Sequence, residues 1–210
     1  RVLSLNEYPG IENYFMSQHV RSVLGYHGNE LQRYDELLGG KNEWRNIGSP
    51  NLLKLLAVRY VVIAQPVQTP ILSAVGSGPL TTVDGQPAYL YRVTDPAPYA
   101  FLVGEALQLP DSQTIPTLLD PRFDLRRMLL VAPDQHIGLT TLQQHEIPAP
   151  VTTPVAVREL RPGAFRFELG APRAEPAYLF VSENYYPAWH AEVDGHEARV
   201  VRAQYSLMAV

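Results

Sequence analysis

The clearest pattern of apolar and polar positions lies between residues 155 and 182. Residues 165–169 alternate apolar and charged side chains, and 155–160 carry a similar run on the other side of Arg161-Pro162-Gly163. Two such runs around a turn that contains Pro and Gly are typical of a β-hairpin. Residues 178–182 form a mostly apolar run, which predicts a further strand.

A second hairpin is predicted around Asp194-Gly195, because this dipeptide is a favoured two-residue hairpin loop. The resulting register pairs Val193 with His196 and Ala191 with Ala198.

Two helices are predicted in the first third of the chain. The first spans 29–38, with Asn29 as its N-cap and Gly39-Gly40 as its end. The second begins at Ser49-Pro50-Asn51, because Pro is favoured at the first helical position, and it leads into a β-branched strand at 58–63.

Proline and polar residues dominate the middle of the chain, where fewer elements are predicted. These are strands at 89–93, 100–103 and 128–131 and a short helix at 120–126. The proline-rich stretch 147–154 is predicted to be an interdomain linker or a long excursion.

The predicted fold class is α+β. An N-terminal α/β region at 1–150 precedes a C-terminal antiparallel β-sandwich at 151–210, of an immunoglobulin-like or jelly-roll-like type, because several short strands there alternate with turn signals. The final residues, 202–210, are predicted to form one continuing strand. The sequence leaves open whether the two regions share one core.

Composition describes a folded chain and excludes several functional classes. The 210 residues are 46% hydrophobic and 18% charged, so a disordered polar chain is excluded. The net charge of -4 supplies no basic stripe, and no nucleic-acid partner is expected. The absence of cysteine removes disulfides, thiolate metal sites and cysteine nucleophiles.

The ends of the sequence suggest a part of a longer polypeptide. No run of about 18 apolar residues is present. The sequence begins at Arg1, with neither an initiator Met nor a signal peptide. We expect an excised segment, although disorder at the ends would look the same.

One stretch carries a family resemblance. Residues 182–195, with Tyr185-Tyr186-Pro187-Ala188-Trp189 and Val193-Asp194-Gly195, followed by Gln204-Tyr205, resemble the C-terminal signature of the YfhO family of bacterial multi-pass membrane proteins. The family more often has Gly at Ala188 and Asn at Gln204. Weaker similarity runs in the same order through upstream stretches of the chain, so the resemblance spans nearly all of it but is specific mainly in 178–208.

This resemblance implies a location and a role. Family members look like GT-C type glycosyltransferases, with many membrane helices followed by an extracytoplasmic domain. The chain is then expected to be that domain, tethered at the extracytoplasmic face of a bacterial cytoplasmic membrane. It would be non-catalytic alone, would require no cofactor and would support sugar or acceptor binding in cell-envelope glycosylation.

The implied partners are the membrane-embedded part of its own parent chain and a polyprenyl-linked sugar or cell-envelope glycan. Two alternatives stay open: a purely structural or protein-interaction ectodomain, and a secreted carbohydrate-binding module.

The strongest candidate binding residues follow the run at 178–182. They combine aromatic rings with a carboxylate and an amide, which is how proteins stack and hydrogen-bond sugars: Glu183, Asn184, Tyr185, Tyr186 and Trp189. The alternative interpretation is that Trp189 and one tyrosine fill the core.

A second candidate is the glycine-flanked stretch around Tyr26 and His27, with Arg33 nearby, which would form an exposed loop facing a partner or a membrane surface. The alternative is an ordinary turn before a helix.

Catalytic and metal sites are not predicted. His190, Glu192 and Asp194 share one face of the second hairpin, but His196 returns on the other face, so no three-ligand cage closes. The carboxylate pairs and Ser residues lie outside any recognisable catalytic motif.

Overall fold

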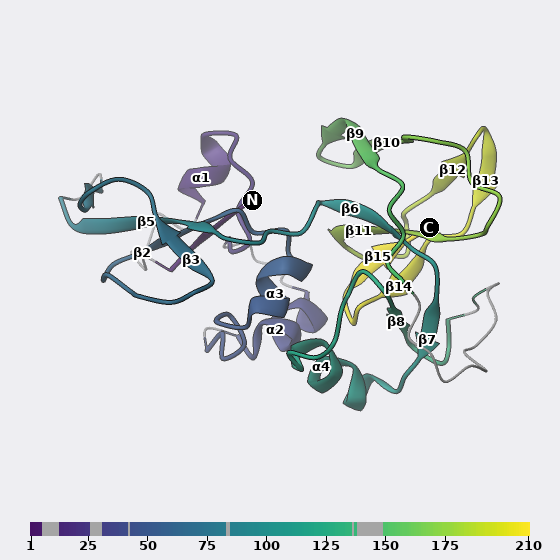
Figure 1. Cartoon of the computed structure of the whole chain (residues 1–210), viewed down its shortest axis with the longest axis horizontal. Coiled ribbons are helices and arrows are strands. Elements are labelled where there is room, and N and C mark those ends of the chain that lie inside the picture. The colour runs from purple at the N-terminus through teal and green to yellow at the C-terminus, as the bar shows by residue number, and fades with distance from the viewer. Residues whose placement is uncertain (6–12, 26–30, 42, 83–84, 136, 138–148) are drawn as a thin grey trace.

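The computed structural model describes residues 1–5, 13–25, 31–41, 43–82, 85–135, 137 and 149–210. Figure 1 shows two β-sheets, helices beside them, and two separate hairpins formed by the C-terminal half of the chain. In chain order the elements are β1 (Val2–Ser4), α1 (Tyr14–Ser17), α2 (Gln32–Leu38), α3 (Pro50–Leu55), β2 (Tyr60–Ile63), β3 (Leu72–Ala74), β4 (Leu80–Thr81), β5 (Pro87–Val93), β6 (Ala100–Val103), β7 (Ala106–Gln108), α4 (Asp111–Leu119), β8 (Leu129–Val131), β9 (Val155–Arg161), β10 (Ala164–Leu169), β11 (Tyr178–Asn184), β12 (Ala191–Val193), β13 (His196–Ala198), β14 (Val201–Ala203) and β15 (Leu207–Ala209).

The first sheet has the order β1-β2-β5-β3, with β4 also paired to β5. β1 runs parallel to β2, and the other pairs are antiparallel. Arg1, one residue of the site described below, immediately precedes β1, and its carbonyl accepts a hydrogen bond from the Arg59 amide just before β2 (3.0 Å).

The start of α3 and the end of α2 are as the sequence predicts. The Ser49 side chain accepts a hydrogen bond from the Leu52 amide (3.4 Å) and caps α3, and Pro50 occupies the first position of that helix. α2 ends at Gly39 with φ 101°, and a Cβ there would lie 2.6 Å from the Arg45 amide nitrogen. A side chain at this position is therefore excluded both by the clash with the neighbouring backbone and by the positive φ. The predicted start of α2 is wrong: the helix begins at Gln32 with Leu31 in the N-cap position and no side-chain cap, and the predicted cap Asn29 lies outside the described residues.

The helix predicted at 120–126 is wrong, and the structure has α4 just before it. The Asp120 and Asp124 carboxylates accept hydrogen bonds from the Arg122 and Arg126 amides (2.9 and 3.0 Å). Such short-range side-chain bonds hold the backbone in turns and compete with helix formation. α4 itself contains Pro116, which concealed it in the sequence.

The second sheet has six strands in the order β6-β11-β15-β14-β8-β7. The pairs are antiparallel except β7 with β8. β15 lies between β11 and β14, and Phe180, Leu207 and Ala209 are at most 1% exposed. One continuous hydrophobic cluster runs from Leu3 of the first sheet to Ala209 of the second.

The single strand predicted at 202–210 is also wrong. The chain turns after β14 at Gln204 and Tyr205, which have φ of 47° and 76°, and returns as β15. The Gln204 side chain is fully buried and continues the pairing toward β8, accepting from the Leu130 amide and donating to the Met128 carbonyl (3.2 Å each). The side-chain amide therefore gives these two backbone groups of the segment around β8 a hydrogen-bond partner.

A β-hairpin covers one end of the six-stranded sheet. β9 and β10 pair antiparallel as predicted, around Gly163 with φ 76°. Phe165 and Phe167 of this hairpin pack with Val181 and Met208 of the sheet, which makes a β-on-β layer. The α+β class with a C-terminal sandwich of strands is confirmed.

The boundary predicted at residue 150 stays a prediction. The six-stranded sheet takes β6, β7 and β8 from before that position and β11, β14 and β15 from after it. The question of a shared core is answered by the hydrophobic cluster, which contains residues from both sides.

The predicted register of the second hairpin is confirmed. Val193 pairs with His196 and Ala191 with Ala198 in the β12–β13 ribbon, and Asp194 and Gly195 both have positive φ, as their turn requires. Val193 is 53% exposed, so this ribbon extends from the sheet instead of covering it.

Candidate functional site

The carboxylate of Glu183, near the end of β11, is the centre of the candidate site. Its Oε2 accepts hydrogen bonds from Arg1 Nη2 (3.0 Å), from the Tyr99 hydroxyl (2.6 Å) and from Arg21 Nη2. The four residues lie far apart in the sequence, so the fold alone brings them together.

Strand pairing explains how the four residues meet. The Ser182 amide donates to the Tyr99 carbonyl (2.8 Å), which places Tyr99 beside the segment that carries Glu183. The Arg21 carbonyl accepts from the Val2 amide (2.9 Å), so Arg21 is fixed beside β1. The site therefore joins β1, at the edge of the first sheet, to β11 and the segment before β6 in the second.

Both guanidiniums stack on the Tyr99 ring. The Arg1 and Arg21 guanidinium carbons lie 5.2 and 4.8 Å from its centroid, within the range of a cation–π contact. Burial raises the pKa of the Tyr99 hydroxyl well above its usual range, and the adjacent Glu183 charge adds to the effect. Tyr99 is therefore a neutral hydrogen-bond donor at physiological pH.

The two arginines differ in how far they are committed to the fold. The Arg1 side chain is 9% exposed and also donates to the Leu56 carbonyl (3.3 Å) and Ser182 Oγ (3.0 Å). The Arg21 side chain is 35% exposed and reaches its partners through Nη2. Arg1 is a structural cation, whereas Arg21 faces partly into solvent.

A row of aromatic rings continues from this cluster. Phe165 lies 5.9 Å from the Arg21 guanidinium, 6.3 Å from the Tyr99 ring and 5.1 Å from the Trp189 ring. Trp189 is fixed by a hydrogen bond from Nε1 to the Asn184 carbonyl (3.1 Å). All of these rings are only partly buried, so the row borders the surface.

Most of the predicted residues after β11 lie at or near this row. Tyr185 and Trp189 pack against the second hydrophobic cluster, which supports the core interpretation for part of their area. Tyr186 is 59% exposed. The Oδ1 atom of Asn184 is buried without a hydrogen-bond partner in the described part of the chain. Glu183 has the most partners of the set.

The other predicted group is separate from this site. Tyr26 and His27 lie outside the described residues. Arg33 pairs with Asp111 (2.7 Å), and its guanidinium lies 5.2 Å from the Tyr205 ring. Asp111 also accepts from Arg202 (3.2 Å), which is 10% exposed. Burial opposes ionisation of Asp111, but the two arginines outweigh it and hold its pKa below the ordinary value. Arg33 therefore belongs to a network that joins α2, α4 and β14.

Sequence reasoning missed Arg1, Arg21, Tyr99 and Phe165. Of these four, only Phe165 could be recognised from the sequence pattern. The alternation of apolar and charged side chains at 165–169 places Phe165 on the apolar face of its strand. Nothing near Arg1, Arg21 or Tyr99 in the sequence points to Glu183.

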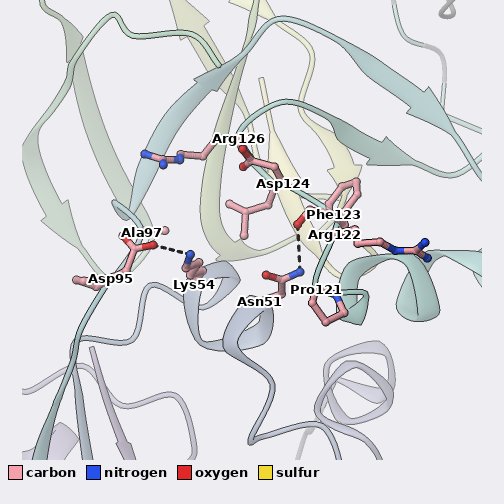
Figure 2. Close-up of a pocket in the computed structure, with 11 residues that line it drawn as sticks. Asn51, Lys54, Asp95, Ala97, Pro121, Arg122, Phe123, Asp124 and Arg126 are labelled. Atoms are coloured by element: carbon pink, nitrogen blue, oxygen red, sulfur yellow. Dashed lines mark hydrogen bonds and ion pairs between the residues drawn. The ribbon is translucent and has the colours of Figure 1, made fainter. Parts of the chain in front are cut away.

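A cavity of about 220 Å³ lies elsewhere, between α3, the turn at Asp95 and the segment after α4 (Figure 2). Two of its lining side chains are paired: Lys54 with Asp95 (2.5 Å), and the Asn51 amide with the carbonyls of Leu118, Asp120 and Phe123 (3.1, 2.8 and 3.1 Å). Asn51 thus satisfies carbonyls at the end of α4. The cavity contains none of the predicted binding residues, and its pairs explain how α3 and α4 are joined.

Within the described ranges, no helix has the length and hydropathy needed to cross a membrane. The same part of the chain contains no cluster of three or more side chains suited to holding a metal ion. Compared with known proteins, the chain matches no family model, no curated protein and no solved structure.

Proposed function

We propose that this chain is the extracytoplasmic domain of a bacterial membrane protein resembling lipid-linked-sugar glycosyltransferases, and that it binds sugar or acceptor without catalysing transfer. The single observation that carries the binding part is the aromatic row of Tyr99, Phe165 and Trp189 beside the Glu183 cluster, at the surface. The membrane and glycosylation parts rest on the resemblance of residues 178–208.

The surface has the chemistry that saccharide recognition uses. Aromatic faces pack against the apolar face of a sugar ring, and fixed charged groups beside them hydrogen-bond its hydroxyls. Tyr186, whose carbonyl accepts a hydrogen bond from the Trp189 amide (3.0 Å), adds an exposed ring. The role assigned to the chain is binding, and the chemistry of transfer belongs to the membrane-embedded part of the parent.

Titration of the chain with uncharged oligosaccharides, followed by NMR, tests the proposal. We expect shift changes at Tyr185, Tyr186 and Trp189. Tyr186→Ala should weaken binding by about 2- to 12-fold, since an aromatic contact contributes roughly 0.5–1.5 kcal/mol. Tyr60→Ala is the matched control, because Tyr60 is a 38% exposed tyrosine on β2 of the first sheet.

A flat titration across many sugars would contradict binding and favour a purely structural or protein-interaction ectodomain. The membrane part has its own test. Coding sequence for hydrophobic spans next to this segment would support a tethered ectodomain, whereas a gene without such spans would favour a secreted carbohydrate-binding module. Loss of sugar transfer on deletion of this segment from an inserted parent would support the accessory role.

A further inference from the structure

The charges around Glu183 do not balance. The Arg1 side chain is 9% exposed and donates hydrogen bonds to Glu183, Ser182 and the Leu56 carbonyl. It therefore neutralises Glu183, the one carboxylate among the four residues of the site. Arg21 shares that carboxylate and supplies a second positive charge. The cluster therefore carries an excess of one positive charge, located on the more exposed of the two arginines.

The geometry of Arg21 leaves it able to bind a ligand. Its contacts to Glu183 and Tyr99 both use Nη2, and its Nε and Nη1 have no hydrogen-bond partner within the described residues. Guanidinium is a planar fork that matches carboxylate and phosphate oxygens. Stacking on Tyr99 and the two Nη2 contacts hold this fork in place before a ligand arrives.

The aromatic row supplies the second half of the site. The Arg21 guanidinium carbon lies 5.9 Å from the Phe165 centroid, which lies 5.1 Å from that of Trp189. A saccharide ring placed over Phe165 and Trp189 would bring an acidic substituent next to Arg21. An uncharged sugar would use the rings but would bring no negative charge to the Nε and Nη1 side of the Arg21 guanidinium.

We propose that this surface selects saccharides that carry a carboxylate or phosphate group, with Arg21 as the residue that determines the preference. The inference rests on the proposed function, because it names the ligand class of the same surface. It goes further in assigning the preference to one side chain that the sequence did not indicate.

The test compares acidic and uncharged probes on the full chain by calorimetry. One pair is trigalacturonate and the corresponding galactose trisaccharide, which lacks the carboxylates. The other pair is N-acetylglucosamine 1-phosphate and N-acetylglucosamine. We expect an acidic probe to bind at least about tenfold more tightly than its neutral counterpart, because a hydrogen bond to a charged group is worth more than a neutral one. The difference should shrink as salt is raised.

The variants separate Arg21 from general charge. Arg21→Gln should abolish the preference, because it lowers affinity for the acidic probe far more than for the neutral one, and Arg21→Lys should keep part of the preference. Arg166→Gln is the matched control, since it removes the same charge from an exposed position on β10. Arg166 lies between Phe165 and Phe167 in sequence and therefore on the face of the strand opposite to them. It should leave the preference unchanged. Thermal unfolding of each variant shows whether the fold is intact, and the salt series on the unmodified chain does not depend on any variant.

The outcomes distinguish the two proposals. Equal binding of acidic and neutral probes would overturn the acidic preference and leave sugar binding in place. Failure of every probe to bind would overturn both. A preference that persists in folded Arg21→Gln would refute the role of Arg21. A preference for only one of the two acid groups would support the inference and identify the group.

Discussion

Replacing Glu183 with Ala should destabilise the whole protein, because this carboxylate joins segments of both sheets. Three donors converge on its Oε2, from Arg1, Arg21 and Tyr99. The substitution removes the acceptor and leaves the Arg1 guanidinium, only 9% exposed, without its counterion.

The expected magnitude follows from burial. Breaking a buried ion pair from one side costs about 3–5 kcal/mol. The Glu183 side chain is 20% exposed, so water partly compensates and the lower end of that range applies, about 3 kcal/mol. For a chain of this length, 1 kcal/mol corresponds to roughly 2–4 °C in Tm, so we expect a decrease of roughly 6–12 °C.

Urea denaturation and thermal unfolding of Glu183→Ala, Glu183→Gln and the unmodified chain measure this effect. Glu183→Gln keeps the shape and one acceptor oxygen, so its loss should be smaller. Glu175→Ala is the matched control, because Glu175 is exposed in the loop before β11 and should change stability by less than about 0.5 kcal/mol. If Glu183→Ala unfolds like this control, the cluster does not hold the two sheets together and the reasoning fails.

Two further predictions concern other groups, Gln204 and Tyr34. Gln204→Leu keeps the side-chain volume but leaves the Leu130 amide and the Met128 carbonyl without their side-chain partner. We therefore expect the free energy of unfolding, measured by urea denaturation, to fall by about 2–4 kcal/mol. An unchanged midpoint would show that these two hydrogen bonds contribute nothing to stability. Burial raises the pKa of Tyr34 to about 12, so its neutral form contributes stability that is fully present below pH 10 and is lost as the pH rises toward 12. Tyr34→Phe should therefore lose less stability than the unmodified chain between about pH 10 and 12, and parallel pH curves would contradict this assignment.

The sequence predicted elements well where a local signal decides the structure. Asp194-Gly195 specified the turn and register of β12–β13, and Ser49 with Pro50 specified the start of α3. In each case one or two residues determine the backbone conformation within a few positions.

The errors arose where tertiary contacts decide. Gln204 and Tyr205 adopt positive φ without being Gly or Asn, and the buried Gln204 amide bonded to β8 accompanies that turn. α4 tolerates Pro116 in its interior. Both features depend on residues distant in the sequence.

The same limit applies to the candidate site. Glu183 and the aromatics after it were recognisable from the sequence as binding residue types. Their charge environment was not, because Arg21 precedes Glu183 by 162 positions and Tyr99 precedes it by 84. A site assembled from one residue per segment leaves no spacing to detect.

The strand order of the six-stranded sheet has a consequence for biosynthesis. The strands in its middle, β11, β15 and β14, all come later in the chain than β6, β7 and β8, which lie toward its two edges. On a ribosome, β6 therefore emerges before β11, the strand with which it pairs, and the parallel pair of β7 and β8 emerges before β14, which joins it to the rest of the sheet. Because long-range strand pairing is slow to form, we expect most of this sheet to assemble after the hairpin of β14 and β15 has left the exit tunnel. The early strands would then depend on chaperones, or on the first sheet and its helices, to keep them from aggregating.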